Sequence, residues 1–228
     1  MAAKHVRRVI AIDGPSGAGK SSVARQLAQV LDYYYVDSGA LYRAAGWVVQ
    51  TQMPSPGEVT ALIERTPIDV RLQDGQSTVW VNGQDITGQL GGEGIGEAAS
   101  AVAVLPGVRE IMTTRLRRLR SQADLVMEGR DIGTVVFPDA TVKFFLQASL
   151  EKRGQRRWHE MRRAGYAMPL AQVIDAMAAR DARDQARAVA PLLCASEAFV
   201  IDTTDLAVDD IVQIMVSEVQ RNILQDDG

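Results

Sequence analysis

The sequence has very little cysteine: Cys194 is the only one among 228 residues. A single cysteine excludes a disulfide within the chain and any metal site built from several thiolates. It is also consistent with a reducing compartment, where disulfides do not persist. We therefore expect a cytoplasmic protein.

Long apolar runs and an excess of positive charge are also lacking. No stretch approaches the roughly 18 uninterrupted apolar residues that a membrane-spanning helix needs. The residues before Asp13 lack the apolar core of a signal peptide. The formal net charge is -3, which does not favour a polyanion such as nucleic acid. We therefore expect neither a membrane nor a nucleic acid as a partner.

What the sequence does contain is an alternation of short apolar runs with amphipathic segments. Runs typical of buried parallel strands occur at 8–13, 33–36, 125–127, 142–146 and 199–201. Helical periodicity occurs at 20–31, 37–48, 93–104, 108–120, 150–163, 169–187 and 208–223, with a break at Pro106. Strands that alternate with helices predict an α/β fold with three layers around a parallel central sheet.

One segment has a different periodicity. The stretches 68–72 and 78–81 alternate apolar with polar residues on either side of Asp74-Gly75, a dipeptide that favours a tight hairpin turn. We predict that this segment forms a small antiparallel sheet inserted into the α/β body.

A phosphate-binding loop follows the first strand. Its residues Gly14, Pro15, Ser16, Gly17, Ala18, Gly19, Lys20 and Ser21 satisfy the pattern G-x-x-x-x-G-K-[ST], and Ser22 comes next. The glycines let backbone N–H groups turn toward phosphate oxygens, Lys20 adds a cation, and the helix N-terminus also favours anions. We therefore predict that ATP binds at 14–22 and that the Ser21 hydroxyl is a ligand of Mg²⁺, with Ser22 able to share in the contacts.

The loop alone leaves three classes open, because GTPase switches, motor ATPases and small-molecule kinases all use it. The guanine-reading sequence N-K-x-D is absent, and the one D-x-x-G match, at Asp85 to Gly88, lies in the predicted hairpin. No strand ends in the Asp-Glu pair typical of motors. The nearest candidate runs from Glu128 to Asp131 and has Arg130 between its acids. These features favour a kinase.

The acids and the arginine after strand 125–127 lie where ligands of parallel α/β sheets bind, beyond the carboxyl ends of the strands. There, Arg130 can form a forked pair with a phosphate. Asp131 or Glu128 can hold either a metal-bound water or a donor group of the substrate. A solvated turn with an internal Arg–Asp pair is the structural alternative.

Arginines also gather on two predicted helices. Arg180, Arg183, Asp184 and Arg187 share one face of a helix by their spacing, and Arg153 and Arg157 form an i, i+4 pair on the helix before it. Several like charges on one face become favourable when a phosphate lies among them. Arg153 and Arg157 could thus reach a transferring phosphoryl group as arginine fingers do.

Five stretches give the sequence a family resemblance through nearly its whole length: GPSGAGKSS, DSGALYR, AASAVAVLPGVR, GRDIGTVVFPDA and RDARDQARAVAPL. In this order they resemble the bacterial cytidylate kinases, which belong to the nucleoside monophosphate kinase group of P-loop proteins. The resemblance implies a P-loop kinase core at 1–38, 110–152 and 188–228. It also implies an acceptor-binding region at 39–109 and an arginine-rich helical lid at 153–187.

The resemblance also implies the roles of individual residues. The CMP site it implies contains Ser38, Tyr42, Arg43, Ser100, Arg109, Arg130, Asp131, Arg180, Asp184 and Arg187. Arg43, Arg109 and Arg130 would grip the acceptor phosphate, and Arg180 with Asp184 would reach the sugar and the phosphate. The catalytic set is Lys20, Arg130, Asp131, Arg153, Arg157 and Arg187. Two departures from the family pattern are Glu128, where aspartate is frequent, and Ser21-Ser22, where Gly-Thr is frequent.

The reaction that we expect is direct in-line transfer from ATP to CMP or dCMP with Mg²⁺, by a monomer, without a phosphoenzyme. Two alternatives remain open at this point. One is a kinase for another small acceptor, such as UMP or a sugar acid, since arginines recognise a phosphate or carboxylate without identifying what carries it. The other is a non-catalytic protein that uses ATP to open or close its lid around a partner.

Overall fold

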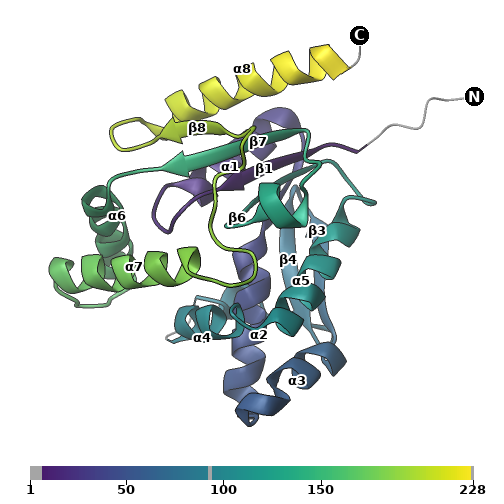
Figure 1. Ribbon diagram of the computed structural model, residues 1–228, viewed down its shortest axis with the longest axis vertical. Coiled ribbons are helices and arrows are strands. Elements are labelled where there is room, and N and C mark those ends of the chain that lie inside the picture. Colours follow the sequence, from purple (N-terminus) through teal and green to yellow (C-terminus); the bar gives the residue numbers. More distant parts are fainter. Residues whose placement is uncertain (1–6, 92–93, 227–228) are drawn as a thin grey trace, which may run out of the picture.

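Parallel strands form the centre of one twisted sheet (Figure 1). The computed structural model describes residues 7–91 and 94–226. Along the sheet, the central strands lie in the order β2 (Tyr34–Asp37), β6 (Leu125–Gly129), β1 (Val9–Asp13), β7 (Val142–Gln147) and β8 (Phe199–Asp202). All of their pairings are parallel. The strands expected from the apolar runs are therefore confirmed.

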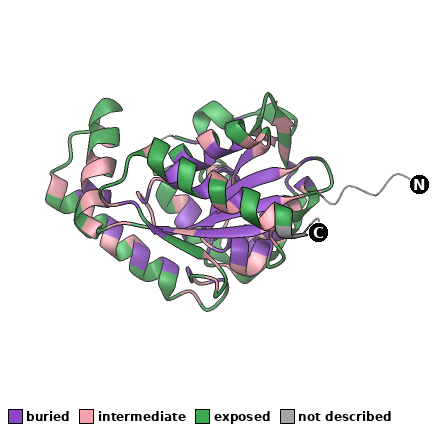
Figure 2. Cartoon of the chain, turned by 90° about the horizontal axis from the view of Figure 1, so that it is seen from above, coloured by how far each residue is buried: buried purple, intermediate pink, exposed green. Residues whose placement is uncertain are grey.

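Both faces of this sheet are buried, which explains why its strands are apolar without interruption. Successive side chains of a strand point to opposite faces, so Val9 and Ala11 pack into one core while Ile10 and Ile12 pack into the other. Figure 2 shows the buried strands between layers of helix whose outer surfaces are exposed.

A layer of helices covers each face. Helices α1 (Lys20–Leu31) and α8 (Val208–Asp226) pack on the Ile10 face. Helices α2 (Ser38–Gln52), α3 (Val59–Arg65) and α5 (Pro106–Leu119) pack on the Val9 face. This arrangement confirms the predicted three-layer α/β fold. Among the described residues, no helix has the length and apolar character needed to cross a bilayer.

The predicted antiparallel unit is present, but it is not a separate sheet. Strands β3 (Ile68–Gln73), β4 (Gln76–Val81) and β5 (Gln84–Asp85) pair in antiparallel fashion. However, β4 also pairs in parallel with β2 through Tyr35 and Gln76, and the N–H of Tyr35 donates to Gly75 O at 2.9 Å. The hairpin therefore extends the main sheet, and it supplies a backbone partner at Tyr35 on the side of β2 that would otherwise be an open edge.

Several elements differ from the sequence-based expectation. Short helix α3, the single turns η1 (Pro56–Glu58) and η2 (Thr87–Gln89), and the π-helical turn η3 (Ile132–Val136) were not predicted. The helix expected at 93–104 is α4 (Ile95–Val102), and residue 93 lies outside the described residues. The break at Pro106 is confirmed, because Pro106 begins α5, where its missing N–H costs no hydrogen bond.

Helices α6 (Leu150–Arg163) and α7 (Leu170–Gln185) pack against each other and project to one side of the layered body (Figure 1). Helix α4 packs closely against α2. The contact occurs at Gly46, where an added Cβ atom would lie 2.7 Å from the backbone N of Ala99. The absence of a side chain at Gly46 therefore sets the distance between α2 and α4.

The substitution Gly46→Val should destabilise the fold by about 2 kcal/mol, because the backbone of α4 cannot yield as a flexible side chain would. Urea unfolding followed by circular dichroism measures this free energy. Gly96→Ala is the control, since the space around Gly96 is open and alanine favours helix by about 1 kcal/mol relative to glycine. Equal stability of the two variants would contradict the close contact.

Candidate active site

The phosphate loop lies at the carboxyl end of β1 and leads directly into α1. Gly17 has a φ of 76°, a left-handed conformation that glycine adopts without strain. A Cβ atom there would lie 2.9 Å from Cε of Met177 and 3.0 Å from Cβ of Arg153. The loop therefore touches both α6 and α7, which connects the predicted lid to the predicted ATP site.

Lys20 is buried at the first residue of α1, and its Nζ donates to Pro15 O at 2.7 Å. Burial, together with the nearby charges of Arg130 and Arg180, lowers the pKa of Lys20 to about 7. The lysine of the loop is therefore close to the arginines assigned to the acceptor. Ser21 and Ser22 follow on the exposed first turn of α1.

Two arginines of α6 contact the phosphate loop, but only one of them is a predicted catalytic residue. Arg153 donates to Ser16 O at 3.1 Å and forms a 2.5 Å ion pair with Asp181 of α7. Arg156, which was not predicted, donates to Gly17 O at 3.4 Å and to Thr203 O at 2.5 Å. Arg157 is half exposed and pairs instead with Glu160 of its own helix at 3.2 Å, so its catalytic role stays a prediction.

A second group of charges lies beside the loop, where α5 meets the turn after β6. Arg109 is buried, forms an ion pair with Asp131, and donates to Ala103 O at 3.2 Å. Its guanidinium lies 5.3 Å from the centre of the Tyr42 ring. Burial raises the pKa of the Tyr42 hydroxyl to about 12, so this group remains a neutral donor.

Helix α7 brings further arginines to the same place. Asp184 is almost fully buried and pairs with both Arg187 and Arg130, the latter at 3.1 Å. Burial and the charge of Arg130 lower the pKa of Arg180 to about 10. Burial also lowers the pKa of Arg187, and the charges of Arg109 and Arg130 add to this effect. The structure thus gathers four of the predicted arginines into one cluster: Arg109, Arg130, Arg180 and Arg187. Arg187 lies two residues beyond the end of α7, and Arg183 is exposed.

The remaining predicted acceptor residues lie on α2 and α4. Arg43 pairs with Asp37 at 2.6 Å. Its positive charge also contributes to the lowered pKa of Arg180. Ser38 is buried and donates to Glu128 O at 2.6 Å. Ser100 is buried on α4, which packs on α2.

Glu128 and Asp13 are buried acids close to Lys20, and their negative charges partly offset the lowering of the Lys20 pKa. Glu128 accepts a hydrogen bond from the Tyr35 hydroxyl at 2.6 Å. Asp13, the last residue of β1, accepts from the N–H groups of Ile132 at 2.9 Å and Gly133 at 2.7 Å. Burial raises the pKa of Asp13 to about 6. The sequence around Asp13 predicts no role for it, because nothing local indicates partners on a distant turn.

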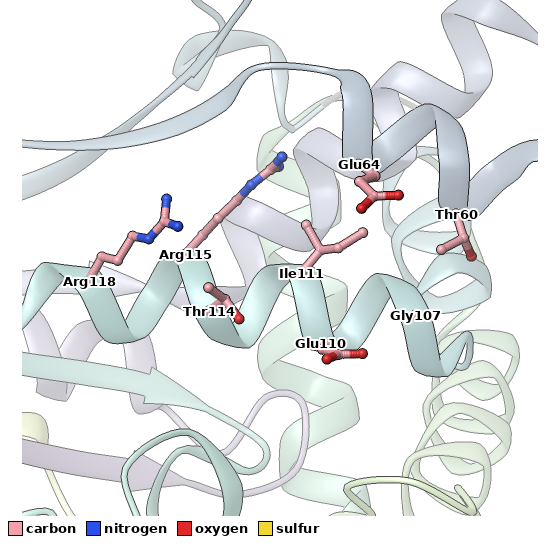
Figure 3. Close-up of a pocket in the computed structure, with 8 residues that line it drawn as sticks. All are labelled: Thr60, Glu64, Gly107, Glu110, Ile111, Thr114, Arg115 and Arg118. Atoms are coloured by element: carbon pink, nitrogen blue, oxygen red, sulfur yellow. The ribbon is translucent and has the colours of Figure 1, made fainter.

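A surface hollow of about 480 Å³ lies elsewhere, between α3 and α5 (Figure 3). Its lining includes Glu64, Glu110 and Arg118, and contains none of the predicted site residues. Arg115 at its edge donates to Ile63 O and Thr66 O, which satisfies carbonyl groups at the end of α3. The hollow is therefore separate from the cluster at the phosphate loop.

The phosphate loop after β1, the parallel sheet and the arginines at its carboxyl edge define a P-loop kinase. The family model described as cytidylate kinase matches residues 10–221. The chain belongs to the cytidylate kinase family.

Individual relatives agree over nearly the full length. The cytidylate kinase of Desulfitobacterium hafniense is 41% identical over 211 residues, which cover 91% of this chain and 90% of the relative. That of a Geobacillus species is 42% identical over 217 residues, which cover 94% and 97%. The crystal structure of an uncharacterized protein from Eubacterium ventriosum gives a TM-score of 0.52 at 12% identity, over 94% of this chain and 99% of that one. That last likeness concerns the fold alone.

ATP binding at pH 8 should be accompanied by the uptake of about one proton, because Lys20 with a pKa of about 7 is mostly neutral there and phosphates favour its charged form. Calorimetric titration with ATP in two buffers of different ionisation enthalpy measures the proton count. Lys20→Arg is the matched control, since a guanidinium stays charged and takes up no proton. Equal uptake by both proteins would assign the proton to another group.

Proposed function

We propose that this protein transfers the terminal phosphoryl group of ATP to CMP and dCMP, with ADP and CDP or dCDP as products. Membership of the cytidylate kinase family supports this reaction. The site supports it independently, because a phosphate loop and a separate arginine cluster lie next to each other. A kinase needs two adjacent anion sites, so that the donor and the acceptor phosphates meet in line.

The observation that carries the acceptor assignment is a set of unsatisfied donors. The Nε atoms of Arg109, Arg180 and Arg187 and the hydroxyl of Tyr42 are buried, and they have no hydrogen-bond partner within the described part of the chain. Buried polar groups are normally paired. A phosphate monoester supplies several charged oxygens at once, so its binding would satisfy this cluster.

Asp131 and Asp184 hold these arginines in place before the acceptor arrives. Asp131 pairs with Arg109, and Asp184 pairs with Arg130 and Arg187. Each carboxylate keeps additional lone pairs that can accept hydrogen bonds from ribose hydroxyls or from the amino group of cytosine. We assign the same region to Ser38, Arg43 and Ser100, whose elements α2 and α4 pack together.

The helices α6 and α7 act in this proposal as a lid over both substrates. Arg153 and Arg187 belong to this segment and lie at the loop and in the acceptor cluster, respectively. Closure of the lid excludes water and thereby limits the hydrolysis of ATP. Catalysis then consists of positioning and charge neutralisation by Lys20 and the arginines, without a strong general base.

The residues present also suit Mg²⁺. Ser21 lies on the exposed first turn of α1, where its hydroxyl can be a ligand. Within the described ranges, no group of three His, Cys, Asp or Glu side chains gathers to form a metal cage. This agrees with Mg²⁺, which is usually held by few protein ligands together with substrate phosphates. When bound, the ion offsets the charge of the phosphates.

The acceptor is tested by measuring the release of ADP with ATP, Mg²⁺ and each of CMP, dCMP, UMP, AMP and GMP. We expect rapid turnover with CMP and dCMP, and its loss when excess EDTA removes Mg²⁺. A preference for another monophosphate would replace the acceptor in this proposal. Tight ATP binding without turnover on any acceptor would favour the ATP-gated regulatory protein instead.

Arg187→Met should lower kcat/KM for CMP by about 100-fold, because it removes a charged donor to the acceptor phosphate. The dissociation constant of ATP should change much less. Steady-state kinetics and calorimetric ATP titration measure the two effects, and Arg163→Met, an exposed lid arginine, is the matched control. Equal losses for CMP and ATP would contradict the separation of donor and acceptor sites.

A further inference from the structure

The π-helical turn η3 begins directly after Asp131, which occupies its N-cap position. The first N–H groups of any helix lack partners within the helix, and an aspartate at the N-cap usually accepts from one of them with its own side chain. Asp131 makes no such bond. Its carboxylate is directed instead to Arg109, the buried arginine of α5.

Asp13, which is distant in the sequence, supplies the missing cap. The two carboxylate oxygens of Asp13 accept separately, Oδ1 from Ile132 N at 2.9 Å and Oδ2 from Gly133 N at 2.7 Å. Asp13 is only 4% exposed. It ends β1, and the register that pairs Asp13 with Gly129 brings it beside the start of the turn.

We propose that Asp13 is a positioning residue that caps η3 in place of Asp131, and thereby leaves the Asp131 carboxylate free to orient Arg109 in the acceptor site. Because this role rests on the proposed function, it concerns how CMP is held rather than whether it is used. Asp13 itself touches no substrate. It acts through the backbone N–H groups of Ile132 and Gly133, the two residues that follow Asp131.

Only a carboxylate fulfils this role completely. Its two oxygens accept from two N–H groups at once, whereas the amide of asparagine has one acceptor and would turn its NH₂ donors toward the second N–H group. In Asp13→Asn the start of η3 would therefore lack half of its cap. Asp131 would then be drawn to the exposed N–H group, and Arg109 would lose its partner.

The test is a double-mutant cycle on CMP affinity, measured by calorimetry without ATP, with Asp13→Asn, Asp131→Asn and the double variant. We expect Asp13→Asn to weaken CMP binding by about 10-fold. We expect the double variant to bind no more weakly than Asp131→Asn alone, because the first change acts through the second residue. ATP affinity, measured in parallel, should not fall, since the charge removed near Lys20 is negative.

Additive losses in the cycle would overturn the proposal, because Asp13 would then act independently of Asp131. A parallel loss of ATP affinity would do the same and would assign Asp13 to the phosphate loop. If Asp13→Asn does not fold, Asp13→Ser, which keeps one acceptor, takes its place in the cycle. Failure of both to fold would assign the two hydrogen bonds to stability alone and overturn the proposal.

The failure of the proposed function would look different. If the wild-type protein bound no CMP at all, the acceptor assignment itself would be wrong, whatever the cycle showed. If the wild type binds CMP and the cycle is additive, only the role of Asp13 fails.

Discussion

The concentration of positive charge at the carboxyl edge of the sheet is the constraint on which the rest of this structure depends. Lys20, Arg130 and Arg180 lie close together, and burial together with the repulsion of the two arginines lowers the pKa of Lys20. Buried like charges are tolerated only where the fold holds them and where carboxylates offset part of the charge. The phosphate loop, α5, the end of β6 and α7 each contribute one part, so no single element could form the cluster alone.

The buried acids around this cluster hold different parts of it in place. Asp184 pairs with two arginines, Asp131 with one, and Asp13 with backbone N–H groups. Asp184 and Asp131 therefore fix guanidinium groups, whereas Asp13 fixes the backbone. The site is held by contacts that cross from strand to turn and from helix to helix, which keeps it shaped for an anion before any anion binds.

The sequence predicted what depends on local pattern, and it missed what depends on distant partners. The phosphate loop and the central strands follow from motif and periodicity, and they have the expected form. The arginine stripe does so only in part, because α7 ends at Gln185, so that Arg187 lies beyond the helix, and Arg183 is exposed. The pairing of Tyr35 with Gln76 joins the hairpin to the main sheet, and no local pattern encodes it. The partners of Asp13 and Arg156 are likewise remote: the turn after β6 is more than a hundred residues from Asp13.

Other misses have simple physical causes. Helix α3 has only 7 residues. Helical periodicity is recognised over a window of about 11 to 18 residues, so a helix this short gives no clear pattern. Arg156 lies three residues after Arg153 and so shares its helix face, a spacing that would have indicated it. Arg157 lies at the equally compatible spacing of four, and only the packing of α6 against the loop distinguishes the two.

The contacts of Arg153 and Arg156 with the phosphate loop have an electronic consequence. Both guanidinium groups bind backbone carbonyl oxygens, those of Ser16 and Gly17. A hydrogen bond to a carbonyl polarises its peptide unit, so the N–H group on the other side becomes a stronger donor. The peptide N–H groups of Gly17 and Ala18 thereby gain positive character. Helix α6, although distant from the loop in the sequence, therefore increases the attraction of the loop for phosphate.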